Sequence, residues 1–224
     1  VSTPTITSMH IPIRDAIRPL LLQYKDQSYV SFSYAQRKQM PELNWCANIY
    51  HGVDTALFGF QPLPKEYDLY LGRVTEDKGV HLAIEAAKAA NVPLLIAGRS
   101  SVNEGYWQSK VESQIDGKMI RYVGEADQAQ KIALLQSARG LLFPTQVDET
   151  FGLVMIEAMS CGTPVIAWRN GAVPEVVSDG KTGFIVDSTD DMVKAIQSIG
   201  TLSREATRRR AEVYFSQEKM ASGY

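Results

Sequence analysis

The sequence has few cysteines and no long apolar run. Only two of its 224 residues are cysteine, Cys46 and Cys161, and their separation matches no metal-binding or redox motif. We therefore expect both to be reduced thiols in a cytoplasmic protein. No apolar run approaches the roughly 18–20 residues of a membrane span, so at most peripheral contact with a membrane is expected.

An excess of charge of either sign is also absent. Lys and Arg together number 23 and Asp and Glu 25, which gives a net charge of −2. Such a chain has no electrostatic attraction for nucleic acid or for an anionic membrane as its main partner. A hydrophobic content of 45% fits a globular protein with a sizeable core. The chain begins Val-Ser-Thr-Pro, with neither a start methionine nor a signal peptide, so we expect a piece of a longer or processed protein.

From residue 67 onward, short apolar segments alternate with segments of helical periodicity. The expected strands are 67–71, 92–97, 119–123, 140–143, 164–167 and 183–186. The expected helices are 79–90, 104–115, 128–138, 152–160, a short one within 171–177, and 189–199, the last capped by Thr189 or Asp190. This alternation predicts an α/β fold, a Rossmann-like parallel sheet with helices on both faces. Ligands of such sheets bind at the carboxyl ends of the strands, where Gly72, Gly98, Gly124 and Pro144 lie.

The two ends of the chain fall outside this alternation. Strands at 5–10 and 29–34, with a helix at about 15–24 between them, are too few to bury a core alone. The first 55 residues are therefore predicted to be the tail of a preceding domain. Residues 203–220 are expected to form one helix. Its arginines, most simply interpreted as a solvated basic face, are Arg204, Arg208, Arg209 and Arg210.

The most informative stretch is ETFGLVMIE, which places Glu149 and Glu157 eight positions apart. Eight residues are a little over two helical turns, so Glu157 returns close to the face on which the helix begins. The backbone N–H groups of Phe151, Gly152 and Leu153 could hold a carbonyl, phosphate or hydroxyl there. The alternatives are an acid placed favourably at a helix N-terminus for Glu149, and a partly buried acid bonded to backbone for Glu157.

Two cations stand in the loop GRVTEDKG that follows the first strand of the repeat. Arg73 and Lys78, beside a helix N-terminus, suit a diphosphate because charge and free N–H groups converge there. The alternative is a surface turn with two ordinary cations. The chain lacks both the GxGxxG spacing and a GxxxxGK[ST] motif, which argues against an NAD site or a P-loop.

Together these pieces resemble a known family. The segments YLGRVTEDKG, LLIAG, YVGEADQAQK, LFPTQVDETFGLVMIEAMSCGTPVIA, GAVPEVV and DGKTGFIV follow the order found in retaining glycosyltransferases of the GT-B fold, family 4 (glycosyl transferases group 1). The resemblance is strong over about residues 45–200 and weaker before them. It implies a remnant of an N-terminal Rossmann-like domain over 1–55, a nucleotide-sugar-binding domain over 56–200, and a helix over 201–224 that returns toward the N-terminal domain.

The resemblance also implies roles for the two charged clusters. Arg73 and Lys78 would hold the donor diphosphate and stabilise the leaving group. Glu149, with the N–H groups of residues 151–153, would bind the donor sugar, and Glu157 would bind the ribose.

Three further parts of the donor site follow from the resemblance. The backbone around Ala126, with Lys131, would meet the base, and the strand-end glycines Gly72 and Gly98 border the same site. His10, in TITSMH, matches a histidine beside the transferred sugar, whereas a strand-end histidine in a polar cleft is the alternative. His51 stands where the family often has Asn, so the turn at 50–54 is interpreted as a connector and not as a site.

The expected reaction is transfer of a sugar, with retention, from a donor such as a UDP- or GDP-sugar to an unidentified acceptor hydroxyl. Two cations and a helix dipole take the place of a metal, so neither a divalent ion nor a cofactor is expected. Glu149 is interpreted as a sugar-binding group, because no Asp/Glu pair resembles a glycosidase couple. A missing N-terminal domain or a partner chain would complete the site. The alternative is a non-catalytic nucleotide-sugar-binding module that needs a partner chain. An epimerase or a phosphorylase of related architecture is a weaker candidate.

Overall fold

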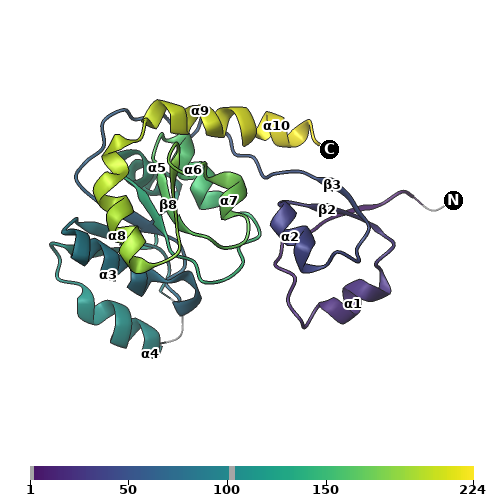
Figure 1. Cartoon of the computed structure of the whole chain (residues 1–224), viewed down its shortest axis with the longest axis horizontal. Helices are drawn as coiled ribbons and strands as arrows, with labels where there is room; N and C mark the ends of the chain where they lie inside the picture. The colour runs from purple at the N-terminus through teal and green to yellow at the C-terminus, as the bar shows by residue number, and fades with distance from the viewer. Residues whose placement is uncertain (1–2, 101–103) are drawn as a thin grey trace.

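The computed structural model describes residues 3–100 and 104–224, so the first two residues of the predicted N-terminal segment lie outside it. Two parallel sheets lie side by side along the longest axis of the molecule (Figure 1). The smaller sheet has the order β1-β2-β3, and the larger has the order β6-β5-β4-β7-β8-β9. The predicted α/β class, with parallel strands and Rossmann-like crossovers, is confirmed.

The larger sheet follows the predicted alternation closely. Its strands are β4 (Asp68–Leu71), β5 (Leu94–Ala97), β6 (Ile120–Gly124), β7 (Leu141–Phe143), β8 (Val165–Trp168) and β9 (Gly183–Val186). Its helices are α3 (Val80–Ala90), α4 (Glu104–Tyr106), α5 (Gln128–Ser137), α6 (Leu153–Ser160), α7 (Val173–Val176) and α8 (Thr189–Ser198). After α4 the expected helix continues as a π-helical turn over Trp107–Val111 and a 3-10 turn over Glu112–Gln114. The N-cap of α8 is Ser188, whose side chain accepts the Asp191 N–H, so the predicted caps were one or two residues late.

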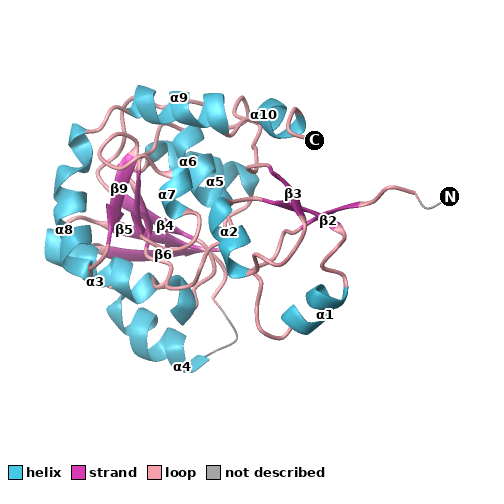
Figure 2. Ribbon diagram, turned by 45° about the vertical axis from the view of Figure 1, so that its right-hand side comes forward, coloured by secondary structure: helices cyan, strands magenta, loops and turns pink. Residues whose placement is uncertain are grey.

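Both faces of the larger sheet are covered by helices (Figure 2). Side chains alternate along each strand, so neighbouring residues enter different cores. Leu69 of β4 packs in the core that holds residues of α5 and α6, whereas Tyr70 packs in the core that holds residues of α3 and α8. This double burial explains why the strands read as continuous apolar runs.

The strand order changes direction between β4 and β7, which pair at Leu69 and Leu141. The chain leaves β4 toward β5 on one side, and leaves β7 toward β8 on the other. The loop after β4 leads to α3 on one face of the sheet, and the loop after β7 leads to α6 on the other face. This switch point is where open α/β sheets bind their ligands.

The larger sheet begins with a buried carboxylate. Asp68 is fully buried, and within the described residues neither of its carboxylate oxygens has a hydrogen-bond partner. Burial raises the pKa of Asp68 to about 7, and nearby Arg139 and the Gly140 N–H oppose that rise only in part. An unfolded Asp titrates near 3.9, so between about pH 4 and pH 7 the folded chain keeps a proton that the unfolded chain has lost. The free energy of unfolding therefore falls as pH rises through this window.

Asp68→Asn is expected to stabilise the protein more at pH 8 than at pH 5. The amide has a similar shape and no charge to bury, so the gain should grow by about 2 to 3 kcal/mol between the two pH values. Urea unfolding at both pH values measures it, with the exposed Asp148→Asn as control. A gain of equal size at both pH values would contradict the assignment.

The smaller sheet belongs to the N-terminal unit. Its elements are β1 (Ile6–Ser8), α1 (Arg18–Gln23), β2 (Ser28–Ser31), α2 (Tyr34–Gln39) and β3 (Trp45–Asn48). The sequence predicts β1, α1 and β2 but neither α2 nor β3. The expected strand at 29–34 is too long, because Ser33 caps α2 by accepting the Gln36 N–H. The core of this unit is small, with five buried residues in its cluster.

The C-terminal segment forms two helices instead of the predicted one. These are α9 (Arg204–Tyr214) and α10 (Gln217–Ala221), separated by buried Phe215 and by Ser216, which caps α10. The segment runs back toward the N-terminal unit (Figure 1), where the Tyr224 hydroxyl lies 2.7 Å from the Ser8 hydroxyl.

The predicted solvated basic face on this segment is wrong for three of its four arginines. Arg204 is buried, and Arg208 and Arg210 are only partly exposed. All three donate to backbone carbonyls outside α9, for example Arg210 Nε to Val176 O at 2.7 Å. Only Arg209 is exposed to solvent. These side chains fasten α9 to the larger domain.

Candidate donor-binding site

Lys78 and Glu149 meet at the switch point between β4 and β7. Lys78 Nζ lies 2.5 Å from Glu149 Oε2, although the two residues are 71 positions apart. The two side chains are 18% and 20% exposed, so a ligand can reach both. The structure thus brings together a cation and an acid that the sequence predicts for one site. The pairing itself was not predicted. It gives Glu149 a charged partner in addition to the nearby helix N-terminus.

Lys78 is positioned by a close contact between two loops. It ends a 3-10 turn over Glu76–Lys78, and Gly79 follows with φ of 70° at the start of α3. A Cβ at Gly79 would lie 2.2 Å from the Pro144 carbonyl oxygen. Only glycine therefore allows the loop after β4 to pack against the loop after β7.

Glu149 is held from its other side by the GAVPEVV segment. Its carbonyl accepts the Ala172 N–H at 3.0 Å. Gly171 has φ of 50°, and a Cβ there would lie 2.3 Å from the Glu149 carbonyl oxygen and 2.5 Å from its nitrogen. Gly171 is therefore a supporting residue of the site that the sequence analysis did not single out, although it lies in one of the quoted motifs.

The start of α6 presents free N–H groups beside Glu149. Gly152 adopts φ of 85° as the N-cap, so the helix begins at Leu153 and not at Gly152 as predicted. Among the described residues, no acceptor is recorded for the N–H groups of Phe151, Gly152 or Leu153. These groups and the helix dipole together create a positive potential at the switch point.

Arg73 lies exposed in the loop after β4, with no ion pair to the rest of the described chain. The Tyr70 hydroxyl donates to its carbonyl at 2.7 Å, which fixes the backbone but leaves the guanidinium free. Gly72 and Gly98 cross closely beside it, since a Cβ at Gly98 would lie 1.8 Å from the Gly72 carbonyl oxygen. Gly98 thus allows a close backbone approach at this edge of the sheet, whereas a Cβ at Gly72 would have room.

A second ion pair joins α5 and α6. Lys131 Nζ lies 2.6 Å from Glu157 Oε1, and their side chains are 22% and 15% exposed. The alternative of Glu157 bonded to backbone is thus replaced by a charge pair. Ala126 lies just before α5 and is partly buried, and Asp127 caps that helix by accepting the Gln130 N–H. The residues predicted for ribose and base are therefore neighbours.

His10 and His51 lie in a cluster of rings between the two units. His51 stacks on Phe32 with centroids 3.8 Å apart, and His10 lies 4.4 Å from the same ring. The His51 ring also contacts the edge of Phe151 at 5.3 Å, so the cluster reaches the Glu149 loop. Burial lowers the pKa of His51 to about 4, with nearby His10 as a second cause. The turn at 50–54 does connect the units, but the expectation of a mere connector overlooked this packing.

Glu175 of α7 ties the N-terminal unit to the site. Its carboxylate accepts the N–H groups of Tyr34 and Ala35 at 2.8 Å each and the Tyr50 hydroxyl at 3.0 Å. It thereby caps α2 from another domain. Ser33 donates to the Thr150 carbonyl at 2.8 Å, next to Glu149. The role of Glu175 could not be predicted from the sequence, because its partners are at least 125 positions away.

Three further observations concern metal-binding side chains, membrane-spanning helices and the two cysteines. Within residues 3–100 and 104–224, no group of three or more His, Cys, Asp and Glu side chains could hold a metal ion. In the same residues, no helix has the length and apolarity needed to cross a bilayer. Cys46 is exposed and Cys161 is buried, and both carry free thiols.

Solved structures share this arrangement of sheets and helices. AviGT4, a glycosyltransferase involved in avilamycin A biosynthesis, aligns with a TM-score of 0.78 and 22% identity over 97% of this chain and 65% of its own. The Anabaena protein HepE, solved in complex with UDP and glucose, aligns with a TM-score of 0.83 and 18% identity over 98% of this chain and 69% of its own. At these identities the likeness shows the GT-B fold.

Curated relatives are more similar in sequence. A phosphatidyl-myo-inositol mannosyltransferase of Mycobacterium leprae is 33% identical over 69% of this chain and 41% of its own length. The corresponding enzyme of Mycolicibacterium smegmatis is 34% identical over 78% of this chain and 47% of its own length. The chain thus spans less than half of either relative. The family described as glycosyl transferases group 1 matches residues 59–214, which include both ion pairs and the loops that hold them. This chain therefore belongs to the glycosyl transferases group 1 family.

Proposed function

We propose that this chain is the donor-binding part of a retaining glycosyltransferase that moves a sugar from a nucleoside diphosphate sugar to an acceptor hydroxyl. The observation that carries the proposal is the Lys78–Glu149 ion pair at the switch point, beside the free N–H groups at the start of α6. HepE, which shares the fold, holds UDP and glucose in its solved complex, and this adds support.

Each charged group has one task in this proposal. Arg73 and Lys78 bind the diphosphate, and the positive start of α6 adds to their field. When phosphate oxygens reach Lys78, they compete with the Glu149 carboxylate for the Lys78 ammonium. The released carboxylate then accepts a hydrogen bond from a hydroxyl of the sugar. Glu157 receives the ribose hydroxyls, and the base lies against the backbone at Ala126, near Lys131.

Catalysis in this proposal rests on stabilising the departing diphosphate. Arg73 and Lys78 offset the charge that develops on the leaving oxygen, so no metal ion takes part. The leaving phosphate accepts the proton of the acceptor hydroxyl on the same face of the sugar, which gives retention. His10 lies beside the transferred sugar, with His51 neutral behind it because burial lowers its pKa.

The missing part of the site belongs to the remainder of an N-terminal Rossmann-like domain. The N-terminal unit exposes large apolar side chains, and β1 forms the open edge of its sheet. Those more than 45% exposed are Ile6, Ile11, Leu20, Leu22, Tyr24 and Tyr34. Further chain that covers this surface would supply the acceptor-binding face, with no nucleic acid and at most peripheral membrane contact.

We place the protein in the cytoplasm, where Cys46 and Cys161 stay reduced. A non-catalytic module completed by a partner chain is the second candidate, because the same surface could receive that chain.

A transfer assay with and without an added N-terminal Rossmann-like domain tests the proposal. The chain alone should bind donor but turn it over slowly, and the completed protein should form product with the anomeric configuration of the donor. Nuclear magnetic resonance of the product reads the configuration. A completed protein that binds donor and acceptor without transfer would favour the non-catalytic module, and an inverted product would contradict retention.

A further inference from the structure

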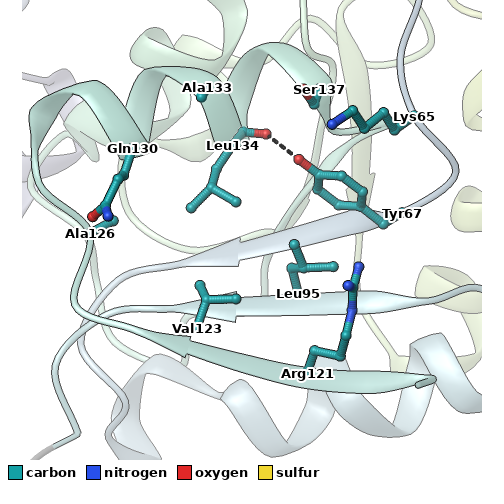
Figure 3. Close-up of a pocket in the computed structure, with 10 residues that line it drawn as sticks. All are labelled: Lys65, Tyr67, Leu95, Arg121, Val123, Ala126, Gln130, Ala133, Leu134 and Ser137. Carbon is teal, nitrogen blue, oxygen red and sulfur yellow. Dashed lines mark hydrogen bonds between the residues drawn. The ribbon is translucent and has the colours of Figure 1, made fainter. Parts of the chain in front are cut away.

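A groove runs between α5 and the strands β5 and β6, with the segment just before β4 at one end, and has a volume of about 600 Å³ (Figure 3). Leu95 and Val123 form its floor, and Ala133 and Leu134 of α5 form its roof. Pockets of roughly 300–1,000 Å³ with mostly apolar walls are the usual sites of small-molecule binding. The groove is therefore large enough for a ligand of that size.

The groove exists because α5 covers only part of this face of the sheet. Leu135 of α5 is fully buried toward the core, whereas the other side of the helix faces the groove. β6 is the edge strand, and its residues Arg121 and Val123 point to the same face because they are two positions apart. Val123 is 47% exposed, so an apolar surface remains open to solvent.

Two cations mark one end of the groove. Lys65 and Arg121 lie at the end opposite to Ala126 and Gln130 (Figure 3). In the described part of the chain, neither side chain has an ion pair or a hydrogen bond, and no carboxylate lines the groove. The Tyr67 hydroxyl between them already donates to the Leu134 carbonyl at 3.0 Å. The two free cations are therefore the groups available to a polar ligand at this end.

We propose that this groove binds a small amphipathic organic anion, whose carboxylate or phosphate meets Lys65 and Arg121 and whose aromatic or alkyl body lies along Leu95, Val123 and Leu134. Unpaired cations beside an apolar wall complement such a molecule at both of its ends. The cationic end of the groove is separate from the donor site, whose proposed base contact, Ala126, lines the opposite end of the groove. Lys65 precedes β4 and Arg121 is the second residue of β6, so both stand at the amino ends of strands, whereas Lys78 and Glu149 follow the carboxyl ends.

Two fluorescent probes that differ in charge test the proposal. Anilinonaphthalene sulfonate carries an anion on an apolar ring system, and N-phenyl-1-naphthylamine has the same rings without it. The double variant Lys65→Gln with Arg121→Gln should weaken binding of the anionic probe by about ten-fold and leave binding of the neutral probe nearly unchanged. Both positions are exposed, so the fold should survive. Ala133→Trp, which fills the groove from the exposed face of α5, should weaken both probes.

Matched controls separate this site from general charge attraction. Lys88→Gln with Lys118→Gln removes the same charge from exposed positions outside the groove and should leave both probes unchanged. Octanoate and octyl phosphate should displace the anionic probe, which distinguishes the two headgroups by their relative strength, whereas octanol should displace it poorly. The proposal is overturned if the control variant weakens binding of the anionic probe as much as the Lys65/Arg121 variant does, or if UDP displaces that probe.

Discussion

Glu149→Gln is expected to weaken binding of the nucleoside diphosphate sugar by about ten-fold to a hundred-fold, the range for losing a hydrogen bond to a charged group. Affinity for the free nucleoside diphosphate should stay the same or rise. The reason is the Lys78–Glu149 pair, with 2.5 Å between its charged atoms. Removing the carboxylate releases the ammonium for phosphate and removes a repelling charge, but it also removes the acceptor for the sugar. Isothermal titration calorimetry with both ligands measures the difference.

Two variants serve as controls for this result. Asp148→Asn changes the same charge at the preceding exposed residue and should leave both affinities unchanged. Lys78→Met should weaken binding of the nucleoside diphosphate and of the nucleoside diphosphate sugar alike, because both ligands carry the phosphates. Equal weakening of the two ligands by Glu149→Gln would instead assign Glu149 to the nucleotide. Thermal unfolding should shift by only a few degrees in each variant, since these side chains are solvent-accessible.

Arg204→Met is expected to lower the free energy of unfolding by about 4 kcal/mol and the melting temperature by about 10 °C. Arg204 is 7% exposed and donates to the carbonyls of Gln61, Gln136 and Ala138 and to the Thr163 hydroxyl, at 2.7 to 3.0 Å. Methionine fills part of the volume but leaves these buried acceptors without a donor. Burial lowers the pKa of Arg204 to about 10, so the side chain stays charged at neutral pH.

Arg209→Met on the same helix is the matched control. Arg209 is exposed, so its replacement should change the unfolding free energy by less than about 0.5 kcal/mol. Urea unfolding of both variants decides the matter. If Arg204→Met unfolds at the same urea concentration as Arg209→Met, the buried network does not fasten α9.

The larger domain was predictable because its signals are local. Four of its buried strands, β4 to β7, end at a glycine or a proline and lead into a helix. Successive side chains along each strand point to opposite faces, so apolar residues at consecutive positions predict a sheet covered on both faces. The N-terminal unit gave a weaker signal, since α2 starts only where Ser33 supplies a cap and Glu175 completes it from another domain. Strand β3 is short and only partly buried, so it lacks the apolar pattern of the others.

The sequence names the residues of the candidate site but not their pairings. Glu149, Glu157 and Lys78 come from motif spacing and Lys131 from the family resemblance, whereas the two ion pairs depend on how loops and helices pack. The sequence likewise could not distinguish a solvated arginine from one that binds carbonyls far away in the chain. Glu175 was overlooked for the same reason, because its partners Tyr34, Ala35 and Tyr50 come from the other unit.

We propose that Arg73, Lys78 and the start of α6 form a diphosphate site at the switch point. Calorimetric titration of this chain with UDP, GDP, ADP and TDP tests this site. We expect at least one of the four to bind with a dissociation constant clearly below about 1 mM, and Arg73→Ala to weaken that binding. If none of the four binds more tightly than about 1 mM, the donor site is not where these residues lie.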